Sequence, residues 1–327
     1  MLLFDKGYSH IKQKYIVPLS KQHVRYSSID HNNIKVVLSK GLYTSVQCTA
    51  KNRYLLTFDE DIIIPALLGD MWLCYIRACL QRDAAQQIYP LSPDYCPNWS
   101  IVSDYYYAFY SACTLLRLTM RGNVYFDSSI QKTINQDITN VLGIPHSISE
   151  NSTYIIQKDS TRSGIYIMDL KPSNHQTHET VWHEVAEVIS EIRQNAPTRS
   201  DERVALDCIT TVLRSLDNNF PSKLRNAVNY QLPYGIKAIE RKIYPAQACQ
   251  PSNKWFDPIL SFEPRKKYDD ANQVQLFKAY TKYLDVLVNN LIAEYNDLHG
   301  RKNGVQTAIN RQRSTPIEFP PITYTYQ

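Results

Sequence analysis

Residues 100–122 read SIVSDYYYAFYSACTLLRLTMRG, and this stretch decides the fold class. Its large side chains recur at three- and four-residue steps, which predicts a helix with one face in a core, formed by Tyr106, Phe109, Tyr110, Cys113 and Leu116. Ser100 belongs to the residue types that cap helix starts, and Gly122 directly after Arg121 is typical of a helix end. We therefore predict a helix from 100 to 121 in a mainly α protein.

The longest apolar stretch of the chain, Ile62 to Leu80, lies just upstream. It contains Asp70 and Arg77, whereas a membrane-spanning helix needs about 20 residues with few or no charges. We therefore expect a core helix and no membrane segment. The acidic residues at 59–61 suit the positive end of a helix that starts there, and Pro65 would then fall in the permitted first turn.

Helical periodicity continues downstream. It predicts helices over 179–192, over 201–216 with Ser200 as the cap, after Pro221-Ser222, and from 269 to 300. The last of these would be about 45 Å long and carries one apolar stripe, made of Val274, Phe277, Tyr280, Leu284, Leu287, Leu291, Tyr295 and Leu298. From this stripe we predict that the protein is at least a dimer.

Two regions have β character. Ile34–Leu38, Tyr43–Cys48 and Tyr54–Phe58 are short β-branched or aromatic runs and predict a small antiparallel sheet. Two alternating runs, Thr153–Gln157 and Gly164–Met168, predict a β-hairpin inserted between helices. We therefore divide the chain into a β-rich region 1–58, a helical domain 59–300 with the inserted hairpin 151–170, and an extended basic, proline-containing tail 301–327.

Composition excludes several protein classes. The chain has 327 residues, of which 43% are hydrophobic and 20% charged, as expected for a globular protein. The seven cysteines form no Cys-x-x-Cys pair and indicate buried thiols in a reducing compartment. Since Met1–Phe4 is too short an apolar stretch for a signal peptide, we expect a cytoplasmic location.

No standard cofactor or metal motif is present. The chain lacks the Gly-x-x-x-x-Gly-Lys and Gly-x-Gly-x-x-Gly loops, and it has no nucleophile elbow. His178 and His183 are five positions apart, one more than a zinc-binding helix requires. We therefore expect neither a metal nor a cofactor.

The positive charge is concentrated in one segment. The net charge is +5, and residues 221–267 carry nine basic against three acidic residues. A basic surface favours phosphate-bearing partners through counterion release, although exposed lysines are also ordinary surface residues. The basic side chains that we assign to phosphate binding here are Lys223, Arg225, Lys237, Arg241 and Lys242.

The sequence Leu224-Arg225-Asn226-Ala227-Val228-Asn229-Tyr230 is the most informative candidate site. On a helix, Arg225 and Asn229 are one turn apart and share a face with Asn226. A guanidinium beside two amides can hold a phosphate or a ribose. The alternative is a helix cap or a set of hydrogen bonds between helices.

Two separated stretches resemble the HEPN superfamily, the higher-eukaryote and prokaryote nucleotide-binding helical domains. Residues 103–116, SDYYYAFYSACTLL, resemble the Tyr-Tyr-Ala-x-Phe-x-Ala helix of that family, which ends in a leucine pair and a later glycine, here Gly122. Residues 224–230 are similar to the family segment in which an arginine, a polar residue and then a histidine follow one another, the histidine four to six positions after the arginine. The resemblance implies a HEPN-like helical bundle.

The resemblance also implies an activity. Active members are dimeric, metal-independent ribonucleases of toxin–antitoxin and antiviral defence systems. By this resemblance Arg225 would hold the scissile phosphate and Asn226 would position it, while Tyr230 stands where the histidine is expected. A base would then come from His183 or His299, or the domain would bind RNA or a nucleotide without cleaving it. A non-catalytic interaction or scaffold subunit of a larger complex is the alternative.

Overall fold

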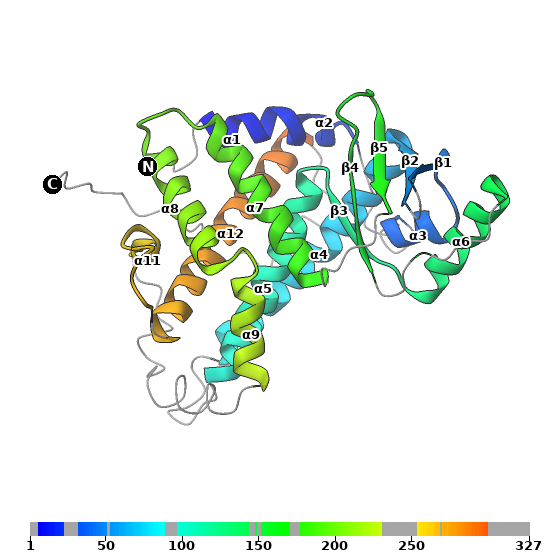
Figure 1. Cartoon of the computed structure of the whole chain (residues 1–327). Helices are drawn as coiled ribbons and strands as arrows, with labels where there is room; N and C mark the ends of the chain where they lie inside the picture. Colours follow the sequence, from blue (N-terminus) through cyan, green and yellow to red (C-terminus); the bar gives the residue numbers. More distant parts are fainter. Residues whose placement is uncertain are drawn as a thin grey trace.

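The computed structural model describes residues 6–22, 32–50, 53–88, 97–143, 148, 152–170, 177–230, 254–268 and 270–299. This part of the chain is mainly helical, as predicted, and it contains one five-stranded antiparallel sheet at one end of the molecule (Figure 1).

The helices are α1 (Lys6–Ile11), a π-helical segment (Lys12–Ile16), α2 (Val17–Ser20), α3 (Ile34–Ser39), α4 (Glu60–Ile88), α5 (Pro97–Leu118), α6 (Ser128–Leu142), α7 (Thr177–Asn195), α8 (Asp201–Leu216), α9 (Phe220–Tyr230), α11 (Asp257–Leu260) and α12 (Asp270–His299). The strands are β1 (Ser45–Ala50), β2 (Arg53–Asp59), β3 (Gly122–Tyr125), β4 (Thr153–Lys158) and β5 (Ile165–Asp169), in the sheet order β1-β2-β5-β4-β3.

Helix α4 is a core element. By length and composition alone, residues 60–85 could cross a membrane. However, 61% of the most apolar 18-residue segment of this helix is buried inside the protein. Its side chains at Ile63, Leu67 and Trp72 lie in the core, so the predicted core helix is confirmed. Helix α4 begins at Glu60, so Pro65 is its sixth residue and lies inside the helix, beyond the first turn. The predicted first-turn position of Pro65 is therefore wrong.

Helix α5 has different ends from those predicted. It begins at Pro97, because proline is favoured in a first turn, and Ser100 is a buried helical residue rather than a cap. The helix ends at Leu118, and Met120 adopts a left-handed backbone with φ of 56°. Arg121 N–H then bonds to the Leu116 carbonyl at 2.8 Å, which closes the helix end.

Gly122 starts strand β3 and does not cap α5. A Cβ atom at this position would lie 2.5 Å from the Ile34 side chain and 3.0 Å from the Leu67 side chain. Glycine is therefore needed so that α3 and α4 can pack closely on the sheet.

The described residues of region 1–58 are less β-rich than predicted. Ile34–Leu38 is helical, because the Asn33 side chain accepts a hydrogen bond from Val36 N–H and Ile34, Val37 and Leu38 bury one helical face. Residues 6–20 are also helical. Only the two later runs form strands, as β1 and β2.

The predicted hairpin is present as β4 and β5, and it forms part of a larger sheet. Strand β5 pairs with β2, from Leu55 opposite Asp169 to Asp59 opposite Ile165, so pairing crosses the predicted boundary at 58/59. Helix α6, with a buried face of Ile130, Ile134 and Ile138, was not predicted. Helices and sheet share one continuous core. The predicted tail 301–327 lies outside the described residues.

Helix α12 confirms the last predicted helix but not the reason given for a dimer. Seven of the eight stripe residues, from Val274 to Tyr295, are buried within the chain, and only Leu298 is exposed. The helix packs on α5, α9, α11 and the N-terminal helices. The buried part of the stripe is therefore used inside one subunit, so it gives no reason to expect a dimer.

Candidate functional site

Helix α9 carries Arg225 and forms where the sequence predicted it. Phe220, Leu224 and Val228 recur every four residues and are buried, with the Phe220 ring 5.9 Å from the Tyr280 ring of α12. This apolar edge docks α9 against the bundle, and Figure 1 shows it along the first half of α5. The neighbouring edge, which includes Arg225, faces the tyrosines of α5.

The guanidinium of Arg225 lies over two aromatic rings. Its central carbon is 5.1 Å from the ring centroid of Tyr105 and 6.0 Å from that of Tyr106. Both distances are in the range of cation–π attraction. The two stretches that carry the family resemblance, at 103–116 and 224–230, therefore meet in the folded chain.

The charge of Arg225 has no acidic partner among the described residues. The side chain is partly buried, and its Nε atom is buried without a hydrogen-bond partner. No described carboxylate forms an ion pair with it, whereas the neighbouring Lys223 pairs with Asp217 at 2.5 Å. Because a desolvated cation without a partner is costly, this position favours an incoming anion.

A polar network lies beside Arg225 and links three helices. The Tyr105 hydroxyl is 2.6 Å from Nδ1 of His178 on α7 and 3.1 Å from the hydroxyl of Ser222 on α9. The indole N–H of Trp182 also donates to Ser222, at 3.0 Å. These bonds fix the Tyr105 ring under the guanidinium.

Burial, followed by the positive charge of Arg225, lowers the pKa of His178 to about 4. The ring packs against Phe109, with centroids 4.3 Å apart, which accounts for the desolvation. Burial also raises the pKa of Tyr105. At pH 7 the imidazole is therefore neutral, and Arg225 supplies the positive charge at this position.

The other predicted site residues are arranged differently. Asn226, Asn229 and Lys223 are exposed, and Tyr230 has 75% of its surface exposed at the last residue of α9. The predicted phosphate-binding residues Lys237, Arg241 and Lys242 lie outside the described residues. Of the predicted residues that the structure describes, only Arg225 reaches the tyrosine pair.

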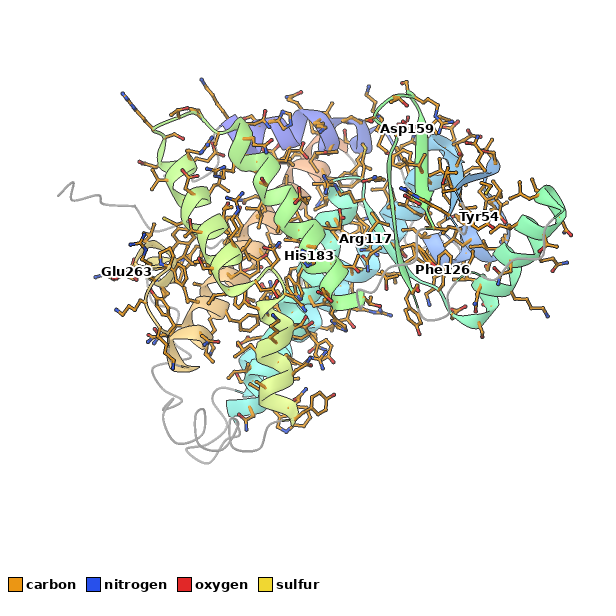
Figure 2. All side chains as sticks on the ribbon, viewed as in Figure 1. Tyr54, Arg117, Phe126, Asp159, His183 and Glu263 are labelled. Carbon is orange, nitrogen blue, oxygen red and sulfur yellow. The ribbon has the colours of Figure 1, made fainter. Side chains whose placement is uncertain are left out.

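The two histidines of α7 face different neighbours. His183 (Figure 2) lies 3.9 Å from Glu179 and 3.3 Å from Asn218, while His178 contacts Tyr105 and Phe109. Their five-residue spacing separates them around the helix, as predicted. The side chain of His299, the other proposed source of a base, is not among those described.

Sequence reasoning missed the roles of His178, Ser222 and Trp182. His178 and Trp182 are four residues apart, which places them on one face of a helix. That spacing does not reveal which helix lies opposite. Only the tertiary fold brings Ser222 and Tyr105 to that face.

Within the described ranges, no three or more histidine, cysteine or acidic side chains are grouped so that they could hold a metal ion. Comparisons with known proteins found no matching family model, no matching curated protein and no matching solved structure.

Proposed function

We propose that the protein binds RNA or a nucleotide, with the guanidinium of Arg225 holding a phosphate group. The observation that carries the proposal is the partly buried Arg225, whose Nε has no hydrogen-bond partner and which pairs with no described carboxylate. A guanidinium presents a planar set of donors that matches phosphate oxygens. A bound phosphate would therefore supply the missing counter-charge.

Aromatic rings near this position suit a nucleic-acid ligand better than a free anion. Tyr106 is partly buried beside Arg225, and Tyr230 is 75% exposed at the end of the same helix. Bases stack on such rings with little sequence preference, at about 1–3 kcal/mol per base. We therefore expect single-stranded RNA to bind more tightly than inorganic phosphate.

The HEPN resemblance extends the proposal to metal-independent cleavage of RNA in a toxin or antiviral defence system. Such cleavage needs a neutral base to take the ribose 2′ proton while Arg225 holds the scissile phosphate. His178, with a pKa of about 4, is neutral at pH 7 and lies in the Arg225 network. Its imidazole is able to accept that proton, as a weak base because of its low pKa.

The test is binding of a fluorescently labelled single-stranded RNA, followed by anisotropy in the presence of a chelator. We expect Arg225→Ala to weaken binding at least tenfold and Arg225→Lys to weaken it less. Lys223→Ala is the matched control, since Lys223 is a nearby exposed cation already paired with Asp217. Equal affinities for wild type and Arg225→Ala would reject the phosphate assignment.

The same samples, run on a denaturing gel, separate binding from cleavage. Loss of full-length RNA with wild type, and its persistence with Arg225→Ala and His178→Gln, supports a ribonuclease. Binding without cleavage supports a binding protein.

A non-catalytic interaction subunit is the second candidate. It is favoured by two large exposed aromatic side chains on α5 and α9, Trp99 at 63% and Tyr230 at 75% exposed. Large aromatic residues are enriched among the anchors of protein interfaces. Absence of RNA binding by the wild-type protein would favour this candidate.

A further inference from the structure

Helices α4 and α5 face each other through three successive side-chain pairs. Arg117 lies 3.9 Å from Asp70 at one end, and the Arg77 guanidinium is 5.7 Å from the Tyr110 ring at the other. Residue numbers rise along α4 while they fall along α5, so the helices are antiparallel. Between these two pairs, Cys74 of α4 lies opposite Cys113 of α5.

The two cysteines lie opposite each other between the flanking pairs, and their surroundings differ. Cys74 is partly exposed, whereas Cys113 is buried. Arg117 is buried, and it donates to the carbonyl of Cys113 at 3.2 Å and to Asn123, which holds it beside the thiols at the junction of helices and sheet (Figure 2). A fixed cation at this position stabilises a thiolate.

The cysteine pair has the asymmetry of an attacking and a resolving thiol. Interaction with Cys113, opposed by burial and aided by Arg117, lowers the pKa of Cys74. The same interaction, together with burial, raises the pKa of Cys113. The thiol that a peroxide can reach from solution therefore lies next to a buried one, as in redox-sensitive cysteines that lie next to a resolving cysteine.

We propose that Cys74 and Cys113 form an oxidation site, at which a hydroperoxide converts the two thiols into a disulfide between α4 and α5. The Cys74 thiolate attacks one oxygen of hydrogen peroxide and becomes a sulfenic acid, while the O–O bond breaks and the leaving hydroxide takes up the proton lost by the Cys74 thiol to give water. The Cys113 sulfur then attacks the Cys74 sulfur, forming the S–S bond and releasing a second water. Two thiols and one hydrogen peroxide give one disulfide and two waters.

This site is separate from the Arg225 surface and does not depend on the proposed function. Other cysteines provide the controls. Cys48 is exposed on β1 and would react by itself, so the experiment uses the Cys48→Ser protein throughout. Cys79 is a buried cysteine on the same helix as Cys74, and burial raises its pKa.

The test is oxidation of the folded full-length protein by hydrogen peroxide, followed by blocking of free thiols, intact mass and non-reducing peptide mapping. We expect a loss of 2 Da, two fewer reactive thiols after denaturation, and one peptide pair joining Cys74 to Cys113. Cys79→Ser should retain that pair, and Cys74→Ser and Cys113→Ser should each lose it. An unchanged mass, a sulfinic acid at Cys74 without a cross-link, or a different cysteine pair would overturn the proposal.

Discussion

The Tyr105 ring joins Arg225 to His178: the guanidinium carbon lies 5.1 Å from the ring centroid, and the hydroxyl of the same ring is 2.6 Å from Nδ1 of His178. One aromatic side chain therefore contacts the unpaired cation with its ring and the imidazole with its hydroxyl. The charge of Arg225 also lowers the pKa of His178, so removing or neutralising that charge would raise the pKa of the histidine.

Removing the Tyr105 hydroxyl should destabilise the protein. Tyr105→Phe keeps the ring but takes a hydrogen-bond partner from His178 and Ser222, and we expect a loss of about 1–2 kcal/mol in the free energy of unfolding. Urea denaturation measures this. Tyr106→Phe, at the next and more exposed tyrosine, is the control and should change stability by less than about 0.5 kcal/mol. Equal losses in the two variants would show that the network contributes nothing specific.

The depressed pKa of His178 should make stability depend on pH. The unfolded histidine takes up a proton near pH 6.5, but the folded one does so only near pH 4. The unfolded state therefore binds more protons between these values. As a result, the free energy of unfolding decreases as the pH is lowered from 6.5 towards 4. Urea denaturation at several pH values measures the slope.

His178→Gln should reduce the slope of stability against pH between 6.5 and 4. His183→Gln is the control, because His183 lies on the same helix with 42% of its side chain exposed. Carboxylates of the folded protein also titrate towards the acid end, so the comparison is made between variants. Wild type and His178→Gln with the same slope would contradict the assigned burial of this imidazole.

Glu202 should hold the N-terminal helix in place. Its buried carboxylate accepts hydrogen bonds from the N–H groups of Gly7 and Tyr8, both at 3.1 Å, and so satisfies the start of α1. Glu202→Ala should cost about 1–3 kcal/mol and speed amide exchange in residues 6–11. Hydrogen–deuterium exchange measures this, with the exposed Glu187→Ala on α7 as the control. Unchanged exchange in α1 would contradict the anchoring role.

Oxidation of Cys74 and Cys113 should stabilise the folded chain. A disulfide between them would close a loop of roughly 40 residues, and restricting the unfolded chain by such a loop is worth at most about 4 kcal/mol. We expect a higher melting temperature for the oxidised protein, reversed by a reductant. A lower melting temperature after cross-linking would mean that the bond strains the α4–α5 packing.

Prediction from helical periodicity and capping residues was correct where one buried helix face and one cap determine the structure. Helix α8 spans residues 201–216 as predicted, because Ser200 caps it by accepting from Arg203 N–H and its apolar residues recur at helical steps. The same prediction was wrong for Ile34–Leu38, because this β-branched run is short enough to form either a helix or a strand. There the Asn33 cap and packing on α4 select a helix.

Only part of the candidate site could be predicted from the sequence. Arg225 could be chosen because arginine and asparagine one turn apart are visible in the sequence. His178 and Ser222 could not be chosen, since they lie 44 positions apart in the chain and meet only through Tyr105 on a third helix. The role of Gly122 could not be predicted either. Helix α5 ends through the left-handed backbone of Met120, whereas Gly122 is glycine because Ile34 and Leu67 leave no room for a Cβ atom.

The most direct measurement is the NMR signal of the Arg225 Nε–Hε group, assigned by its disappearance in Arg225→Lys, during titration with adenosine monophosphate. Adenosine, which lacks the phosphate, is the matched ligand. If Arg225 holds a phosphate, its signal shifts and saturates with the monophosphate and stays unchanged with adenosine. An Nε–Hε signal that does not respond to the monophosphate, or that responds equally to adenosine, would contradict phosphate binding at Arg225.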